Sequence, residues 1–246
     1  MKRIIVDGNN YLMMAISAAE RSGRISISGS ILGNMLEVLF RTFGKDSSYY
    51  VCFDSRGGTT FRKEIDSGYK VERRYDSERI SELENIMTVF SDNGFIDCTI
   101  ESCEADDSIF ALCRVLSEIE NVSDIYVVTR DSDMIQTVQY GYAGHVWDPH
   151  TKKDMVIPSY PIVAIRALSG DRSVGIQGLK GVDPKTAMKI LNGERILTEN
   201  QKKIFNNNLR IIDERLNLRY EENVEFMRSR LSLPEREPSL LMGPAY

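Results

Sequence analysis

Ile-Tyr-Val-Val-Thr-Arg-Asp-Ser-Asp, residues 125–133, is a short apolar run that ends in two acidic residues. An apolar run of this length that stops at polar residues predicts a buried strand. Three further runs have the same form, at residues 2–6, 49–53 and near 95–100, and each also leads into acidic residues. The predicted strands and the acidic residues therefore occur together along the sequence.

The segments between these runs are typical of helices. Residues 30–43, 77–93 and 105–119 place apolar residues three or four positions apart, which is the spacing of a helix with one buried face. Alternating strands and helices predict an α/β fold, with a mostly parallel twisted sheet flanked by helices. Residues 142–147 are a candidate edge strand.

The pattern becomes helical after about residue 158. Helices are predicted at residues 161–168, from Pro184 to Leu191, near 199–215 and near 220–231. We therefore expect a core at residues 1–157, a helical region at 158–233 and a tail at 234–246. Within the core, residues 55–76 are polar and charged without a clean period, and a connection of that length is usually functional or mobile.

Charge is distributed unevenly along the chain, although the net charge is only −5. Residues 1–151 hold 15 basic and 24 acidic residues, whereas residues 152–230 hold 15 basic and 10 acidic ones. An acidic front half thus precedes a basic back half, and a basic region of this kind favours an anionic partner such as nucleic acid.

The cysteines give no sign of a metal site or a disulfide framework. Cys52, Cys98, Cys103 and Cys113 include no pair with CxxC spacing, and no histidine pair accompanies them. We expect no zinc site, buried free thiols and a reducing, cytoplasmic compartment. No run of about 18 apolar residues occurs, so no membrane span is expected.

The acidic residues that follow the predicted strands are candidates for a metal site. Open α/β sheets bind ligands outside the carboxyl ends of their strands, so these residues should converge: Asp7, Asp54, Glu104, Asp106, Asp107, Asp131 and Asp133. A bound cation relieves the repulsion among so many carboxylates. Oxygen ligands without His or Cys select Mg²⁺ or Mn²⁺, and two such ions suit phosphodiester hydrolysis. Taken singly, an acid after a strand is more often a helix cap or a turn residue than a metal ligand.

Five segments together resemble the flap endonuclease and 5′-3′ exonuclease family, with its PIN-like core and helix–three-turn–helix. They are Ile-Val-Asp7-Gly-Asn, Phe-Asp54-Ser-Arg, Glu104-Ala-Asp106-Asp107, Thr-Arg-Asp131-Ser-Asp133, and Ala-Leu-Ser-Gly-Asp171 continuing to Lys185-Thr-Ala. They occur in the family's order and cover about residues 3–192.

The resemblance implies a structure-specific 5′ nuclease with two metal positions, and it adds Asp171 to the seven metal ligands. Residues 55–76 would form an arch over the 5′ strand, in which Lys70 and Arg73 would act on the scissile phosphate. Arg62, Lys63 and Arg74 would contact DNA from the same segment. A solvated loop is the alternative interpretation of that segment.

The resemblance also implies a helix–three-turn–helix at residues 162–192 that grips duplex phosphates, often with a bound K⁺. Glycines let a backbone approach phosphates closely, and a helix that begins at Pro184 would offer free N–H groups to an anion. The expected DNA contacts are Gly178, Lys180, Gly181, Lys185, Thr186 and Lys189. An ordinary helical hairpin with solvated lysines is the alternative.

The expected partners are DNA 5′ ends, flaps, nicks or branches, and RNA in RNA–DNA hybrids. The chain is expected to be a monomer from a bacterial or phage-infected cell.

Two positions depart from the family's pattern. Val174 stands where a second acid is usual, and Asp183 stands where glycine is usual. Val174 suggests a weakened second metal position, so a branched-DNA-binding protein with weak or lost nuclease activity is an alternative. A third possibility is a ribonuclease with similar acidic strand ends, which the basic helical half disfavours.

Overall fold

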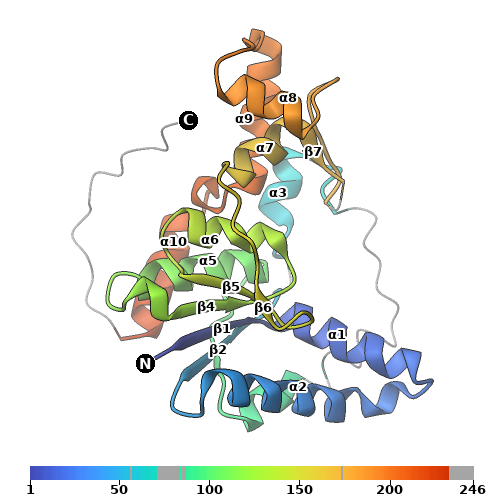
Figure 1. Ribbon diagram of the computed structural model, residues 1–246, viewed down its shortest axis with the longest axis vertical. Coiled ribbons are helices and arrows are strands. Elements are labelled where there is room, and N and C mark those ends of the chain that lie inside the picture. The colour runs from blue at the N-terminus through green and yellow to red at the C-terminus, as the bar shows by residue number, and fades with distance from the viewer. Residues whose placement is uncertain (56, 71–83, 85–86, 173, 233–246) are drawn as a thin grey trace. The chain divides into compact units, whose positions relative to one another are not determined.

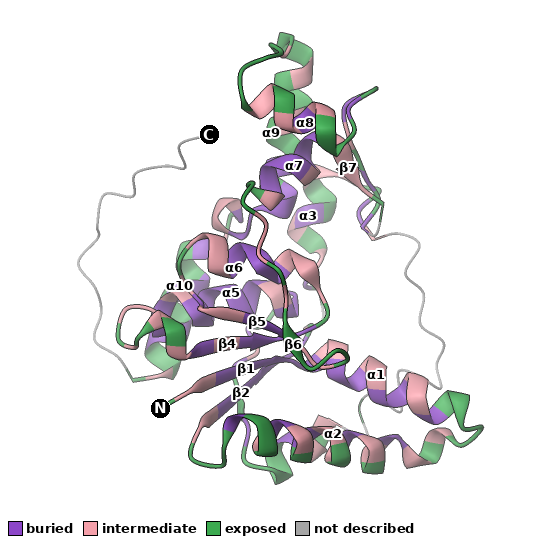
Figure 2. Ribbon diagram, in the orientation of Figure 1, coloured by how far each residue is buried: buried purple, intermediate pink, exposed green. Residues whose placement is uncertain are grey.

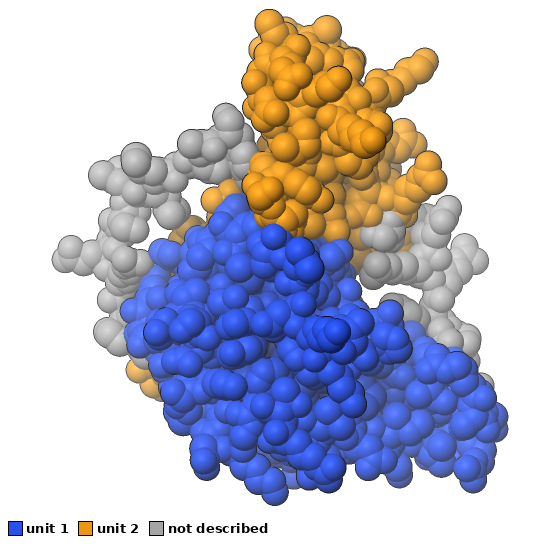
Figure 3. Space-filling view, in the orientation of Figure 1, with its two compact units in different colours: residues 1–59, 72–157 blue, residues 60–71, 158–246 orange. Residues whose placement is uncertain are grey.

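The computed structural model describes residues 1–55, 57–70, 84, 87–172 and 174–232. The chain forms two compact units (Figure 3). Unit 1 comprises residues 1–59 and 72–157, and unit 2 comprises residues 60–71 and 158–246. The C-terminal region begins where the sequence pattern changes, but residues 60–71 of the expected arch belong to unit 2 and not to the core.

Unit 1 is built on a six-stranded sheet with the order β3-β2-β1-β4-β5-β6 (Figure 1). The strands are β1 (Arg3–Asp7), β2 (Ser48–Cys52), β3 (Ile96–Asp97), β4 (Ile125–Val128), β5 (His145–Asp148) and β6 (Lys153–Asp154). The first five are parallel, and only β6 pairs antiparallel. The predicted mostly parallel α/β sheet is therefore confirmed. The strand predicted at residues 142–147 is present as β5, but its expected position at the edge of the sheet is wrong, because β6 pairs with its outer side.

Helices cover both faces of this sheet (Figure 1). One face carries α1 (Gly8–Arg21), the 3₁₀ turn η1 (Ile25–Ile27) and α2 (Ser28–Phe43). The other carries α5 (Ala105–Leu116), which contacts β1, β2 and β4. The short elements η2 (Val122–Asp124), η3 (Ser132–Met134) and α6 (Ile135–Gln139) flank β4.

The core of unit 1 lies between the sheet and α1 and α2 (Figure 2). Ile4 and Val6 of β1 belong to this cluster, together with Leu12 of α1 and Leu36 of α2. Ile5, between them, is also fully buried and faces the opposite side, because side chains alternate along a strand. The four cysteines are buried thiols, as predicted, and none of them is joined in a disulfide.

The sequence did not predict α1, because Gly8, Asn9 and Asn10 are poor helix formers at its start. Asp7 compensates by capping this helix through the backbone N–H of Asn10. Residues 87–92 are helical, whereas most of the rest of the helix predicted at 77–93 falls outside the described residues.

Unit 2 is mainly helical, as expected. Its elements are α3 (Thr60–Ile65), α7 (Ile162–Ser169), β7 (Gly170–Asp171), β8 (Ile176–Gln177), α8 (Pro184–Leu191), α9 (Glu199–Ile212), η4 (Glu214–Leu216) and α10 (Tyr220–Arg230). Strands β7 and β8 pair as an antiparallel hairpin between α7 and α8. A small apolar cluster includes Leu168, Leu179 and Ala187. None of the described helices is long and apolar enough to cross a membrane.

Candidate active site at the switch point of the sheet

The acidic residues of unit 1 gather where the strand order of the sheet changes direction. Strand β1 lies between β2 and β4, and open α/β sheets bind ligands outside the strand ends at such a point. Asp7 is the last residue of β1 and is level with Cys52 of β2. Asp54 follows β2 and Asp131 follows β4, so their backbones reach the same edge.

Asp7 is buried, with 5% of its surface exposed. Its carboxylate accepts hydrogen bonds from the backbone N–H of Asn10 at 2.9 Å and from the Thr129 hydroxyl at 2.8 Å. Burial is the largest cause that raises the pKa of Asp7, the two hydrogen bonds oppose it, and the nearby charges of Asp54 and Asp131 add to it, which together bring the pKa to about 6. The site therefore holds negative charge in a poorly solvated position, and a bound cation would stabilise the ionised form of Asp7.

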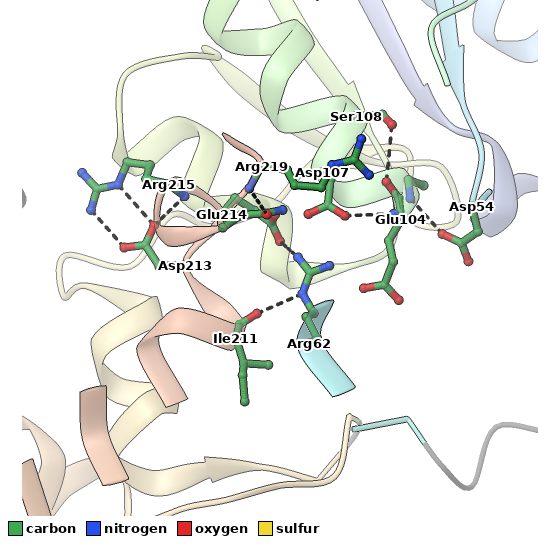
Figure 4. Close-up of polar contacts among 12 residues, drawn as sticks. Asp54, Arg62, Glu104, Asp107, Ser108, Ile211, Asp213, Glu214, Arg215 and Arg219 are labelled. Carbon is green, nitrogen blue, oxygen red and sulfur yellow. Dashed lines mark hydrogen bonds and ion pairs between the residues drawn. The ribbon is translucent and has the colours of Figure 1, made fainter. Parts of the chain in front are cut away.

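Asp54 is fixed between two parts of the chain (Figure 4). Its Oδ1 accepts from the backbone N–H of Ala105 at 2.8 Å, and its Oδ2 accepts from Asn9 at 3.1 Å. The loop that holds Asp54 lies directly against the loop before α5, because a Cβ at Gly58 would sit 2.6 Å from the carbonyl of Cys103. Glycine at position 58 therefore allows Asp54 and Glu104 to approach each other.

The acidic segment before α5 also caps that helix. Glu104 is 3% exposed, and its side chain and that of Asp107 form a reciprocal capping box with the first turn. Asp107 accepts from the backbone N–H of Glu104 at 2.8 Å. Asp106 lies in the same turn and is half-buried. The helix-cap interpretation of these residues is therefore correct for Glu104 and Asp107.

Asp131 and Asp133 form the turn after β4. The carboxylate of Asp131 accepts from the backbone N–H of Asp133 at 2.8 Å and caps η3. The backbone N–H of Asp131 donates to the Thr129 hydroxyl at 3.0 Å. Thr129 therefore bridges the carboxylate of Asp7 and the turn that carries Asp131.

The donor chemistry of the site fits a hard divalent cation, because Asp7 and its charged neighbours Asp54 and Asp131 are carboxylates. Yet no three His, Cys, Asp or Glu among the described residues lie close enough together to hold one ion. The full convergence expected from the sequence is thus not seen in this part of the chain. The physical reason is local: Asp54, Asp107 and Asp131 direct oxygens to backbone N–H groups.

Asp171 belongs to β7 of unit 2. Its carboxylate faces Arg166 of α7, with 3.5 Å between Arg166 Nη1 and Asp171 Oδ2. The assignment of Asp171 to the metal site stays a prediction.

Arg62 does not occupy the DNA-contacting position that was predicted for it. Only 2% of its surface is exposed. It forms a 2.7 Å ion pair with Glu214 and donates from Nε to the carbonyl of Ile211 at 3.1 Å (Figure 4). Its guanidinium also lies 4.5 Å from the centre of the Phe61 ring. Arg62 therefore anchors α3 within unit 2.

The other basic residues of the expected arch are Lys63, Lys70, Arg73 and Arg74. Lys63 is exposed. Lys70 has a left-handed backbone, with φ of 50°, and its ammonium lies 5.2 Å from the centre of the Tyr69 ring. Arg73 and Arg74 are outside the described residues.

The predicted helix–three-turn–helix consists of α7, the β7–β8 hairpin, a loop and α8. Lys180, Lys185 and Lys189 are exposed on it, as are Gly181 and, in part, Gly178 and Thr186. Helix α8 begins at Pro184, as predicted, but one of the backbone N–H groups at its start is already used. Asp183 caps α8 by accepting from the backbone N–H of Thr186 at 2.7 Å, and this hydrogen bond lowers the pKa of Asp183.

Three uncharged residues of functional interest were not predicted: Asn9, Thr129 and Asn208. Asn9 and Thr129 each stand two positions from a candidate ligand, so their signal was proximity to the acids in the sequence. Asn208 gave no signal, because its hydrogen-bond partners are 31 and 41 residues away.

Residues 2–160 match the N-terminal resolvase-like domain of the 5′-3′ exonucleases. The chain belongs to this family. It is 30% identical over 207 residues to DNA polymerase I of Pseudomonas aeruginosa. The aligned region covers 77% of this chain but only 22% of that protein. It is 27% identical over 209 residues to the 5′-3′ exonuclease of Bacillus subtilis, covering 77% of this chain and 69% of that one.

Solved structures of the family have the same fold. The bacteriophage T5 5′-exonuclease with bound zinc ions superposes with a TM-score of 0.70 at 14% identity, covering 95% of this chain and 99% of that one. The T5 flap endonuclease in a complex with DNA and metal ions gives a TM-score of 0.66 at 14% identity, covering 94% and 98%.

Proposed function

We propose that this chain is a metal-dependent, structure-specific 5′ nuclease that hydrolyses DNA phosphodiester bonds as a 5′-3′ exonuclease and flap endonuclease. The supporting observation is the position of Asp7. It is a buried carboxylate at the switch point of a parallel sheet, and the nearby charges of Asp54 and Asp131 raise its pKa. The family match supports hydrolysis at DNA 5′ ends as the activity of this site.

Divalent cations would be held by Asp7, Asp54 and Asp131, with Glu104, Asp106, Asp107, Asp133 and Asp171 completing the ligand set. When bound, such cations lower the pKa of a water molecule and stabilise charge on the leaving oxygen. Mg²⁺ or Mn²⁺ is proposed, because the donors are oxygens. The zinc ions of the T5 enzyme support a divalent site in the family.

The chain's own residues would orient the substrate. Asn9 and Thr129 hold the carboxylates of Asp54 and Asp7 in place. Lys70 and Arg73 would position the scissile phosphate as fixed positive charges. The exposed lysines near α8 would bind duplex phosphates, which predicts salt-sensitive binding with little dependence on base sequence.

The alternative of a DNA-binding protein with lost activity has less support. It was motivated by Val174, but only the second metal position would lose a ligand there. The Asp7 site keeps its carboxylates and the residues that orient them. The ribonuclease alternative also has less support than the family's action on DNA.

A 5′-labelled flap duplex tests the proposal directly. The wild-type chain should cut it in Mg²⁺ or Mn²⁺ and stop in EDTA. Asp131→Asn should lower the cleavage rate by about 100-fold or more. Asp46→Asn is the matched control, because Asp46 is an exposed acid just before β2, at the opposite end of the strands. Equal cleavage by the wild type and Asp131→Asn would refute the assignment.

The finer features need separate measurements. Rates with Mg²⁺ and with Mn²⁺ would identify the preferred ion, and an RNA–DNA hybrid would test the side substrate. Light scattering would test the proposed monomer. Duplex affinity in K⁺ and in Na⁺ would test the K⁺ proposed at the helix–three-turn–helix.

A further inference from the structure

Lys70 is held in an unusual backbone conformation by a residue more than one hundred positions away. Its φ of 50° is one that residues other than glycine adopt rarely. The backbone N–H of Lys70 donates to the carbonyl of Val174 at 3.1 Å. A strained conformation of this kind persists only where surrounding contacts impose it. The contact with Val174 is therefore part of what orients Lys70.

The contact belongs to a close approach of two backbone segments inside unit 2. The side chain of Val174 is buried, with 8% exposed. Gly175 follows with φ of 81°, and a Cβ there would sit 3.1 Å from the carbonyl oxygen of Gly68. The turn of the hairpin and residues 68–70 thus approach each other closely through their backbones, and a side chain at position 175 would press on the Gly68 carbonyl.

The other end of the same hairpin is fixed by Asn208 of α9. Asn208 is 6% exposed, and its side-chain amide donates to the carbonyls of Ala167 at 2.8 Å and Gln177 at 2.9 Å. Gln177 ends β8 and leads directly into the loop at residues 178–181. The backbone N–H of Leu179 in that loop donates to Leu168 of α7 at 2.8 Å.

We propose that the β7–β8 hairpin links the loop at residues 178–181, where duplex phosphates would bind, to the backbone of Lys70. Gly175 and Asn208 are then positioning residues: they act on cleavage through Lys70 without touching the substrate. The proposal rests on the proposed function of Lys70 and of the loop. It also gives Val174 a role that does not depend on an acidic side chain, because its carbonyl makes the contact.

Gly175→Ala tests the junction with Lys70. The added Cβ presses on Gly68 and moves the turn away from Lys70, so kcat for flap cleavage should fall roughly ten- to a hundredfold, with KM nearly unchanged. Gly193→Ala is the matched control, because Gly193 also has positive φ, at 78°, but nothing lies within 4 Å of its Cβ position. It carries the same backbone strain without the contact, and kcat should be retained.

A double-mutant cycle separates positioning from a general structural defect. If Gly175 acts through Lys70, then Gly175→Ala should have little further effect in a Lys70→Ala background. Equal reductions by Gly175→Ala in both backgrounds would overturn the proposal.

Asn208→Leu tests the other end of the hairpin. It should weaken duplex binding in EDTA and lower kcat together, because both the loop and Lys70 lose their common anchor. Asn207→Leu is the matched control, since Asn207 is the exposed neighbour on the same helix. Unchanged duplex binding and kcat in Asn208→Leu would overturn the role of Asn208.

Hydrogen exchange gives a readout that does not need catalysis. Adding an unbranched duplex in EDTA should slow exchange of the Lys70 amide at least threefold in the wild type and leave it unchanged in Gly175→Ala. Slowed exchange in a protein that cuts no flap would support the link and refute the proposed function. A duplex that binds without slowing exchange at Lys70 would overturn the link, even in an active enzyme.

Discussion

Replacing Asp7 with asparagine is predicted to stabilise the metal-free protein while removing its activity. Burial and neighbouring charges raise the pKa of Asp7 from 3.8 to about 6. One unit of pKa corresponds to about 1.4 kcal/mol, so the ionised carboxylate costs the folded state about 3 kcal/mol. Asparagine removes the charge but satisfies the Thr129 hydroxyl less well, at a cost of about 1 kcal/mol. The expected net gain is about 1–2 kcal/mol.

The sign of the pH dependence follows from the raised pKa. Protonated Asp7 is favoured in the folded state, so its stabilising contribution is complete below pH 3.8 and is lost as the pH rises through about 6. The advantage of Asp7→Asn should therefore be largest at pH 8 and should shrink towards pH 4.

Thermal unfolding in EDTA at pH 8, 6 and 5 measures this difference. At pH 8 the variant should unfold roughly 2–8 °C above the wild type, given a domain of this size. Asp46→Asn, an exposed neutralisation in the same unit, should change Tm little. A variant that is less stable than the wild type at pH 8, or a difference independent of pH, would refute the reasoning. Flap cleavage by Asp7→Asn should be lost in Mg²⁺.

Two further predictions concern unit 2. Arg62→Met removes the 2.7 Å ion pair with buried Glu214, so it should lower the free energy of unfolding in denaturant by about 3–5 kcal/mol. The exposed control Lys63→Met should change it by less than about 0.5 kcal/mol. A similar loss of stability in both variants would contradict the role of Arg62 as a buried anchor. Asp183→Ala should lower stability at pH 7 by removing the cap of α8. Because the hydrogen bond to Thr186 lowers the pKa of Asp183, this stabilisation should disappear as the pH falls through that lowered pKa. Asp183→Asn should keep the cap and increase duplex affinity at low salt, and unchanged affinity would place Asp183 away from the DNA.

The sheet and the position of its acidic edge could be predicted, because both depend on local patterns and one topological rule. Apolar runs gave β1, β2 and β4, and the acid after each run followed from the same residues. Parallel pairing then placed Asp7, Asp54 and Asp131 at one edge without knowledge of their contacts.

The roles of individual side chains could not be predicted where they depend on distant partners. Arg62 looked like a DNA contact because nothing near it in sequence shows that Glu214, 152 residues away, neutralises it. Asp183 looked like an unfavourable charge because its capping hydrogen bond depends on where α8 begins. For a related reason the strand pattern did not show that Asp54, Asp107 and Asp131 each bond to a backbone N–H at a helix end or turn.

The division of the chain has a practical consequence for anyone who shortens this protein. Helix α3 lies between two stretches of unit 1 in sequence, yet it packs with α9 in unit 2. A fragment that stops at Ile157 would keep α3 but lose Ile211 and Glu214, which leaves the Arg62 guanidinium with neither acceptor. Such a fragment should be prone to aggregation or proteolysis near α3, and a clean excision of the nuclease core needs a short linker in place of residues 60–71.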